Sequence, residues 1–373
     1  MYKRLAFTLL KYLLAISVLT WLIWSNWAPE NGKGLSYVWE RVVRDGITSI
    51  RWDYLLYGTL LFATGVLLTL IRWYLLVRCQ GLPLTLGNAI RLGLIGCFFN
   101  LILLGSVGGD VVKAAALARE QSRRTVAVAT VIMDRIIGLW GLAWLVGLTG
   151  AAFWVTGQLE DDGGPKSKLV IEVTSCILLV SLVVWFALGF LNNQRAEAFA
   201  QRLTRLPKVG GPAAEFWRAV WMYRCQQRAV LASLVLSWFG FGLFVPAFYF
   251  CALTLWSPAD MGRMPTFQQH FMVVPIGLLM RAMPLFPAGM GIGEFSFAEL
   301  YYWFTGIEGS RTSGLLGSLM QRVLEAVTGM IGFAVYMAVP ARVPANGVRP
   351  VPATAESPAQ IWAPAAAEGS TVA

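Results

Sequence analysis

The most regular feature of this chain is a series of long apolar runs separated by short polar segments. Runs of about 20 apolar residues are long enough to cross a lipid bilayer as α-helices. The pattern therefore predicts an all-α, polytopic membrane protein with about six full spans. We expect these spans at residues 5–27, 54–77, 126–155, 169–191, 229–256 and 312–339.

Two further apolar segments are each interrupted by a glycine-rich break. Each break contains three glycines followed directly by an acidic residue. These are Gly105, Gly108, Gly109 and Asp110 in the first break, and Gly289, Gly291, Gly293 and Glu294 in the second. Irregular backbone inside a bilayer survives only where it is buried in protein or lines a cavity. The breaks therefore predict the tips of two re-entrant hairpins, at about 92–109 and 271–304, with the glycines as hinges.

The distribution of basic residues predicts how these segments are oriented. Lysine and arginine concentrate at the N-terminus and in 78–91, 110–124 and 195–228. Cytoplasmic loops carry such an excess, so we expect a cytoplasmic N-terminus. The first hairpin then enters from the cytoplasmic side and the second from the outer side. Within 195–228, apolar residues spaced along the basic stretch are compatible with two short amphipathic helices on an anionic membrane face or with a solvated loop.

This orientation gives the chain two halves of opposite topology. Residues 54–155 and 229–339 each contain a span, a broken hairpin and a second span. Inverted repeats whose broken helices meet near the bilayer midplane are a recurring plan of transporters. We expect one transmembrane domain over 1–340, followed by a disordered tail rich in proline and alanine at 341–373.

Composition excludes several classes of protein. Hydrophobic residues make up 57% of the chain and charged residues 13%, whereas a soluble domain carries about 25% charged residues. The net charge of +10 favours anionic lipid over nucleic acid as a partner. The five cysteines have no metal-site spacing, the only histidine is His270, and the first glycine run lacks the Lys-Ser/Thr of a P-loop. We expect no cofactor and no bound metal.

Charged residues within apolar sequence are the candidates for a functional site. Asp110, Glu294, Arg135 and Arg322 would each be costly in a bilayer unless paired or placed in a wet cavity. They could hold a zwitterionic or phosphate-bearing headgroup, with the arginines on the phosphate. Alternatively, they could form two structural ion pairs, Asp110–Arg135 and Glu294–Arg322.

Other residues near the breaks are secondary candidates. Lys113 and Arg281 could contact a headgroup, although Arg281 could also extend to the membrane surface. Asn100 could cap freed backbone or touch ligand. Glu325 lies one turn after Arg322 and is an alternative partner for it, which would leave Glu294 free. We expect the Arg72 side chain to reach the membrane surface. Asp134 could lie either at the membrane interface or in the functional site.

Several motifs together resemble a known family. Phe-Phe-Asn at 98–100, Gly-Ser-Val-Gly-Gly-Asp-Val-Val-Lys at 105–113, Asp-Arg-Ile-Ile-Gly at 134–138, and 287–294 with Arg322 are similar to motifs of the lysylphosphatidylglycerol synthase transmembrane-region family, also described as flippase-like. The similarity covers about 5–340. It departs from the family at Leu104, where proline is common, and at Lys113, where arginine is common.

The resemblance implies a role in moving lipid between leaflets. Lipid-modifying members carry a soluble aminoacyltransferase domain after the membrane region, and here a Pro/Ala-rich tail follows instead. We therefore expect no aminoacylation by this chain, and no catalytic role. The favoured hypothesis is a translocator for a phospholipid or a polyprenyl-phosphate-linked lipid in the bacterial cytoplasmic membrane. The alternatives are an integral-membrane enzyme acting on a lipid-linked sugar or phospholipid, and a non-transporting membrane subunit. Expected partners are anionic or phosphate-bearing membrane lipids and a membrane protein.

Overall fold

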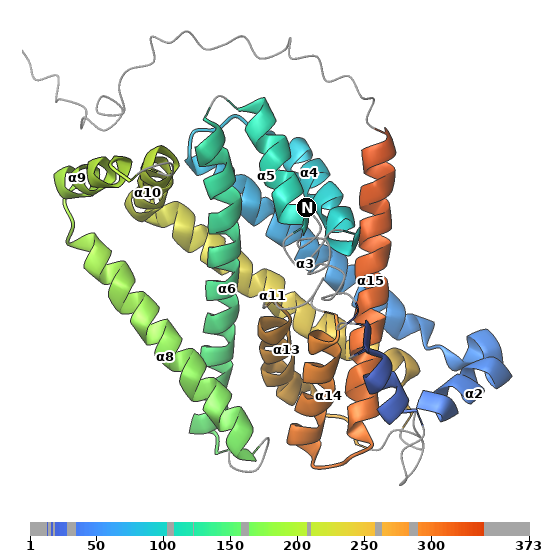
Figure 1. The fold of residues 1–373 in the computed structure, drawn as a ribbon. Coiled ribbons are helices and arrows are strands. Elements are labelled where there is room, and N and C mark those ends of the chain that lie inside the picture. The colour runs from blue at the N-terminus through green and yellow to red at the C-terminus, as the bar shows by residue number, and fades with distance from the viewer. Residues whose placement is uncertain are drawn as a thin grey trace, which may run out of the picture. The chain divides into compact units, whose positions relative to one another are not determined.

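The computed structural model describes residues 13, 16–17, 19–27, 35–102, 108–121, 123–157, 164–206, 210–257, 263–282 and 290–338. All regular structure in these ranges is helical (Figure 1), as predicted. By its internal contacts the chain divides at Met337, and the second unit, Ala338–Ala373, lies outside the described residues except for Ala338. The prediction of a disordered tail therefore concerns residues that are not described.

Four helices are long and apolar enough to cross a membrane: α3 (Trp52–Cys79), α6 (Arg124–Val155), α8 (Gly164–Gly189) and α11 (Gln227–Leu255). They match four of the predicted spans. The predicted span at 312–339 corresponds to α15 (Ser310–Ala338), which has 29 residues but is not among the four because it is less apolar. About half of the predicted span at 5–27 lies outside the described residues, and 19–25 are helical.

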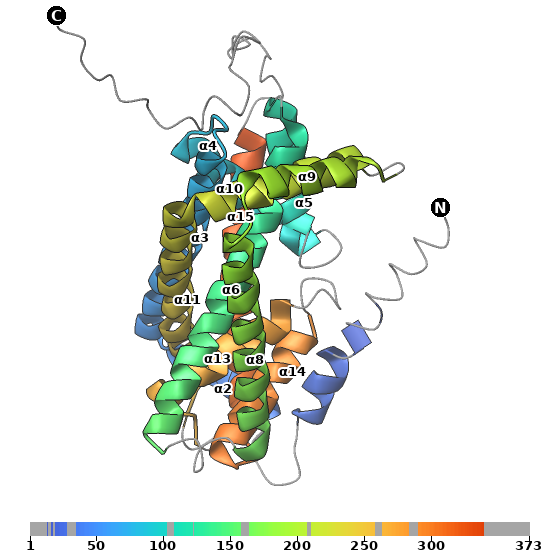
Figure 2. The ribbon, with the colours of Figure 1, turned by 90° about the vertical axis from the view of Figure 1, so that its left-hand side faces the viewer.

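Each predicted hairpin is a pair of packed helices. The first pair is α4 (Leu86–Ile102) with α5 (Gly108–Glu120), and the second is α13 (Phe267–Ala282) with α14 (Ile292–Thr305). The intervening residues 103–107 and 283–289, with Gly105 and Gly289, lie outside the described residues. The α4/α5 pair lies beside one end of α6 and the α13/α14 pair beside the other in both views (Figures 1 and 2).

The same order of elements occurs twice along the chain. The long helix α3 precedes the first hairpin and α6 follows it, just as α11 precedes the second hairpin and α15 follows it. The two leading helices, α3 and α11, pack against each other. Glycines allow this close approach, because a Cβ at Gly58 or Gly65 would lie 3.2 or 3.1 Å from a backbone oxygen of α11. The orientation of each half relative to the membrane stays a prediction.

Short helices lie outside this framework. They are α2 (Leu35–Asp45), the 3₁₀ helix η1 (Gly46–Ser49), α9 (Asn193–Thr204) and α10 (Gly210–Cys225). Of the two alternatives for 195–228, the structure has the two short helices, α9 and α10; their place on an anionic membrane face stays a prediction. They lie across the ends of the longer helices (Figure 2). Arg218 of α10 forms an ion pair with Glu197 of α9, and Trp217 donates a hydrogen bond to the carbonyl of Ala196.

Candidate functional site

All but one of the charged residues selected from the sequence line one cavity of about 420 Å³, which we call the charged cavity; the exception is Glu294. Its walls come from α3, from both helices of the first hairpin, and from α6, α11, α13 and α15. The charged and amide side chains that line it are Arg72, Asn100, Asp110, Lys113, Asp134, Arg135, Arg281, Arg322 and Glu325. Residues from both halves of the chain therefore share a single polar space.

Asp110 lies in the first turn of α5 and binds two cations. Its Oδ2 accepts a hydrogen bond from Arg135 Nη1 at 2.8 Å, and its Oδ1 lies 2.8 Å from Lys113 Nζ. Asn100 Oδ1 accepts a hydrogen bond from the Gly109 N–H at 2.7 Å. Asn100 thus caps the N-terminus of α5, which is the simpler of its two predicted roles.

Arg135 connects the two hairpins. Its Nη1 binds Asp110 of α5, whereas its Nη2 donates to the carbonyl oxygen of Ala282, the last residue of α13, at 3.4 Å. The last carbonyls of a helix have no partner within the helix and carry partial negative charge. A cation held between a carboxylate and a helix C-terminus can respond to movement of either hairpin.

Glu294 is buried behind the charged cavity rather than in its wall. Only 1% of its surface is exposed, and its Oε1 accepts a hydrogen bond from Arg322 Nε at 2.7 Å. Its Oε2 accepts a hydrogen bond from the N–H of Gly291, whose φ of 82° lies in the region that favours glycine. Glu294 therefore reaches the cavity only through Arg322, and the expectation that Glu325 would leave it free is wrong.

Glu325 instead binds mainly Arg281. The Arg281 Nη2 group donates to Glu325 Oε2 at 2.7 Å, whereas Arg322 Nη1 is 3.5 Å from the same oxygen. Arg281 is 7% exposed, so the alternative in which it extends to the membrane surface is wrong. Its Nη1 is buried and has no hydrogen-bond partner among the described residues. A buried guanidinium nitrogen without a partner is costly, and an anion in the cavity would supply one.

Arg72 and Asp134 form a further ion pair, buried on both sides, that was not predicted from the sequence. Arg72 Nε donates to Asp134 Oδ1 at 2.8 Å, and Arg72 Nη1 donates to Ser237 Oγ at 3.0 Å. Arg72 is 5% exposed and Asp134 7%, so the surface position expected for Arg72 is wrong, and of the two alternatives for Asp134 the interfacial one is wrong. One signal was available: Asp134 and Arg135 are adjacent and point to different faces of a helix, so each needs its own partner.

Glycines make room for three of the cations that line the charged cavity. A Cβ at Gly96 would lie 3.0 Å from the Lys113 side chain, and one at Gly138 would lie 3.0 Å from Arg72. A Cβ at Gly293 would lie 3.1 Å from the Arg281 side chain. Gly293, predicted as a hinge, therefore also bounds the path of a cation toward the cavity.

The charges of the cavity do not balance. Among the described residues, five cationic side chains line it against three carboxylates, and Glu294 supplies a fourth carboxylate behind Arg322. Residues 103–107 and 283–289, which lie outside the described part of the chain, include no charged residue. A surplus of positive charge in a low-dielectric site favours an anionic ligand. In the described part of the chain no cluster of His, Cys, Asp and Glu could hold a metal ion.

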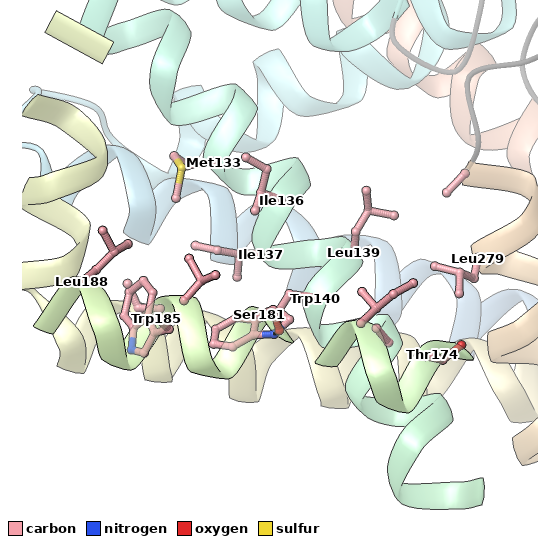
Figure 3. A pocket seen from close by; sticks show the side chains of 15 residues that line it. Met133, Ile136, Ile137, Leu139, Trp140, Thr174, Ser181, Trp185, Leu188 and Leu279 are labelled. Carbon is pink, nitrogen blue, oxygen red and sulfur yellow. The ribbon is translucent and has the colours of Figure 1, made fainter. Parts of the chain in front are cut away.

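An apolar groove lies beside the charged cavity, with a volume of about 560 Å³ (Figure 3). We call it the apolar groove. Most of its lining comes from α6 and α8, with Val230 of α11 and Leu279 and Ala282 of α13. Leu139 and Ala282 line both the groove and the charged cavity, so the two spaces are adjacent.

Comparison with known families identifies the class of protein to which this arrangement belongs. A family model described as the lysylphosphatidylglycerol synthase TM region matches residues 8–332. The chain belongs to this family. This family membership and the four helices able to cross a bilayer indicate an integral membrane protein whose role concerns membrane lipids. No curated protein and no solved structure matches the chain.

The part of the chain that matches the family model includes both hairpins and every residue that lines the charged cavity. Of the residues selected from sequence, Asn100, Asp110, Lys113, Arg135, Arg281 and Arg322 line the cavity together. Glu294 contacts it through Arg322, and Gly105 and Gly289 lie outside the described residues. Gly108, Gly109 and Gly291 lie at the first residues of α5 and at the N-terminal cap of α14.

Proposed function

We propose that this protein is a lipid translocator that moves an anionic lipid between the leaflets of the membrane. The lipid is a phospholipid or a polyprenyl-phosphate-linked lipid. The observation that carries this proposal is the charged cavity, where the cations among the described residues outnumber the carboxylates. Among the described residues, no group pairs with the buried Nη1 of Arg281. A phosphate group would satisfy that nitrogen by a charge-assisted hydrogen bond.

The position of Arg135 supports movement of a headgroup rather than simple storage. Arg135 binds Asp110 of the first hairpin and the carbonyl of Ala282 at the end of the second. A phosphate that binds Arg135 would compete with Asp110 and so loosen one hairpin from α6. Binding that favours one of two arrangements of the hairpins shifts the population between them. Re-entrant hairpins entering from opposite faces would then open the cavity to each leaflet in turn.

The hydrogen bonds of the two carboxylates favour transport over catalysis. A general base needs a free carboxylate within reach of a substrate proton. Asp110 is held by Lys113 and Arg135, and Glu294 is held by Arg322 and the Gly291 N–H. We therefore propose that these carboxylates position cations and have no catalytic role.

Leaflet exchange in reconstituted vesicles tests the proposal. The probe is phosphatidylglycerol with a fluorescent acyl chain, whose outer-leaflet fraction is quenched by a membrane-impermeant reductant. We expect Arg135→Gln to lower the exchange rate roughly tenfold to a hundredfold, as the loss of a charged hydrogen bond predicts. Arg135→Lys should retain part of the rate. Arg218→Gln is the matched control, since its ion pair with Glu197 lies on the exposed surface of α9 and α10.

Two results would count against translocation. Equal exchange rates for the original protein and Arg135→Gln would exclude a role for the cavity in transport. Headgroup turnover that Asp110→Asn abolishes, with exchange unchanged, would favour the alternative of an integral-membrane enzyme. The thermal stability of each variant in detergent shows whether the variant has folded. A non-transporting structural subunit predicts that these substitutions act only by lowering that stability.

A further inference from the structure

The apolar groove has no use in the scheme above, yet its chemistry is well defined. Its walls are formed by large hydrocarbon and aromatic side chains, among them Ile136, Ile137, Trp140, Trp185 and Leu188 (Figure 3). Two polar groups of the walls, those of Trp140 and Ser181, are paired with each other. Trp140 Nε1 donates to Ser181 Oγ at 2.9 Å, and Ser181 Oγ donates to the Leu178 carbonyl at 2.7 Å. The groove therefore offers hydrocarbon contact and little hydrogen bonding.

The groove is open along one side. Its rim includes Ile136, which is 49% exposed, and Ile177, which is 60% exposed. Most of the α8 surface is likewise exposed in the structure. Exposed apolar surface of this kind on a membrane protein faces hydrocarbon rather than water. A lipid chain could therefore enter the groove sideways from the bilayer core, without passing through water.

The helix α6 separates the groove from the charged cavity. Arg135 and Gly138 line the cavity, Ile136 and Trp140 line the groove, and Leu139 lines both. Ala282 also lines both spaces, and its carbonyl accepts the hydrogen bond from Arg135 Nη2. An anionic group on Arg135 would thus lie next to the junction at Leu139 and Ala282. An amphiphile has this same order of anion, short linkage and hydrocarbon.

We propose that the apolar groove holds a hydrocarbon chain of the same lipid whose anionic headgroup occupies the charged cavity. The lipid bends over the junction at Leu139 and Ala282. The proposal rests on the proposed function for the identity of the headgroup ligand, but it assigns a separate site to the chain. The groove volume of about 560 Å³ lies within the range of small-molecule pockets, roughly 300 to 1,000 Å³.

Photochemical labelling of the full-length protein tests the proposal without requiring transport. The protein is placed in phosphatidylcholine nanodiscs that contain phosphatidylglycerol with a diazirine in one acyl chain. After irradiation, labelled peptides are mapped by mass spectrometry. We expect labels on the faces of α6 and α8 that line the groove.

Two tryptophan substitutions on α8 give a matched comparison. Ile177→Trp fills the groove and should lower groove labelling roughly tenfold. This is the effect expected when about two methylene groups of the lipid chain can no longer be buried there. Leu179→Trp adds the same side chain to the same helix at a residue that is 63% exposed and does not line the groove. It should leave groove labelling unchanged.

Headgroup dependence tests whether chain and headgroup belong to one lipid. The same diazirine chain on phosphatidylcholine should label the groove more weakly, and Arg281→Gln should reduce labelling by phosphatidylglycerol to that level. Equal labelling by both lipids would overturn the link to the charged cavity. Soluble glycerol phosphate should compete poorly, and full competition by it would assign the cavity to a small anion and overturn the proposal.

The remaining outcomes separate this inference from the proposed function. Groove labelling without leaflet exchange would support the chain site and count against translocation. Leaflet exchange with labels confined to the outer face of α8 would overturn the chain site alone. Cross-links between two protein chains at the groove, with no lipid label, would assign it to a protein contact instead and also overturn the proposal.

Discussion

Arg281 Nη2 donates a hydrogen bond to Glu325 Oε2 at 2.7 Å, which joins the end of α13 to α15 inside the charged cavity. The other terminal nitrogen, Nη1, is buried and has no partner among the described residues. Glu325 therefore holds the guanidinium in place and leaves one of its donors for a ligand. The roles of the two residues can be separated by substitution.

Arg281→Gln should weaken binding of phosphatidylglycerol roughly tenfold to a hundredfold, since a hydrogen bond to a charged group contributes about 1.5 to 3 kcal/mol. Glu325→Gln should instead retain the affinity or raise it, because Arg281 would lose its competing anion, while thermal stability falls. Native mass spectrometry with titrated lipid measures the affinity. Equal affinities for Arg281→Gln and the unmodified protein would remove Arg281 from the site.

Breaking the Arg72–Asp134 pair should cost more than replacing it. Both side chains are buried and joined at 2.8 Å. Arg72→Met alone leaves Asp134 as a buried unpaired carboxylate and should destabilise the protein by about 3 to 5 kcal/mol. The double variant Arg72→Met/Asp134→Leu removes both charges and should recover most of that loss. Unfolding in detergent measures both, and equal losses would show that the pair is not coupled.

The crossing of α4 and α5 should not tolerate a methyl group at Gly109. A Cβ there would overlap the backbone carbonyl oxygen of Gly96 and lie 2.8 Å from Asn100 Oδ1. Gly109→Ala should therefore cost at least about 1 to 3 kcal/mol, the usual range for overpacking. Gly87→Ala in α4 is the control, because a Cβ there meets nothing within 4 Å and alanine favours the helix by about 1 kcal/mol. Thermal unfolding of both variants measures the difference.

The contact between α9 and α10 should weaken in acid. The hydrogen bonds from Arg218 hold the pKa of the Glu197 carboxyl below its ordinary value. A carboxyl group whose pKa is lowered by folding stabilises the folded state at pH values above its ordinary pKa, and this stabilisation is lost as the pH falls through the lowered pKa. Amide hydrogen exchange over 193–225, corrected for the intrinsic exchange rate, should therefore rise as the pH falls from the ordinary carboxyl pKa through the lowered one. Glu197→Gln should show faster exchange at neutral pH, whereas Glu215→Gln should not.

Apolar run length located the long helices, because the length of a span is fixed by the thickness of the bilayer. The runs behind α3, α6, α8 and α11 are long enough to be recognised individually. The glycines and carboxylates also predicted where the apolar helices end, since α4 ends at Ile102 and α13 ends at Ala282. Residues 103–107 and 283–289 are not described, so the re-entrant tips stay a prediction. The pairs Asp110–Arg135 and Glu294–Arg322 followed as an alternative, since each hairpin needs a partner for its carboxylate.

The pairs Arg72–Asp134 and Arg281–Glu325 could not be predicted in the same way. Their members are 62 and 44 residues apart in the chain, and their contacts depend on how α3 packs on α6 and on where the end of α13 lies relative to α15. No periodicity within one helix carries that information. The apolar groove was missed for the same reason, because apolar residues on a span look alike in sequence whether they face lipid, protein or a groove.

Gly96, Gly138 and Gly293 bound the paths of Lys113, Arg72 and Arg281, and this has a consequence for genetic screens. An alanine at any of these positions would change neither the charge nor the polarity of the protein. It would nevertheless push an ammonium or guanidinium group by tenths of an ångström, enough to misplace it toward a phosphate oxygen. Mutations that impair lipid binding or translocation should therefore also occur at these glycines, which carry no functional group. They would include glycine-to-alanine substitutions, which are usually regarded as conservative.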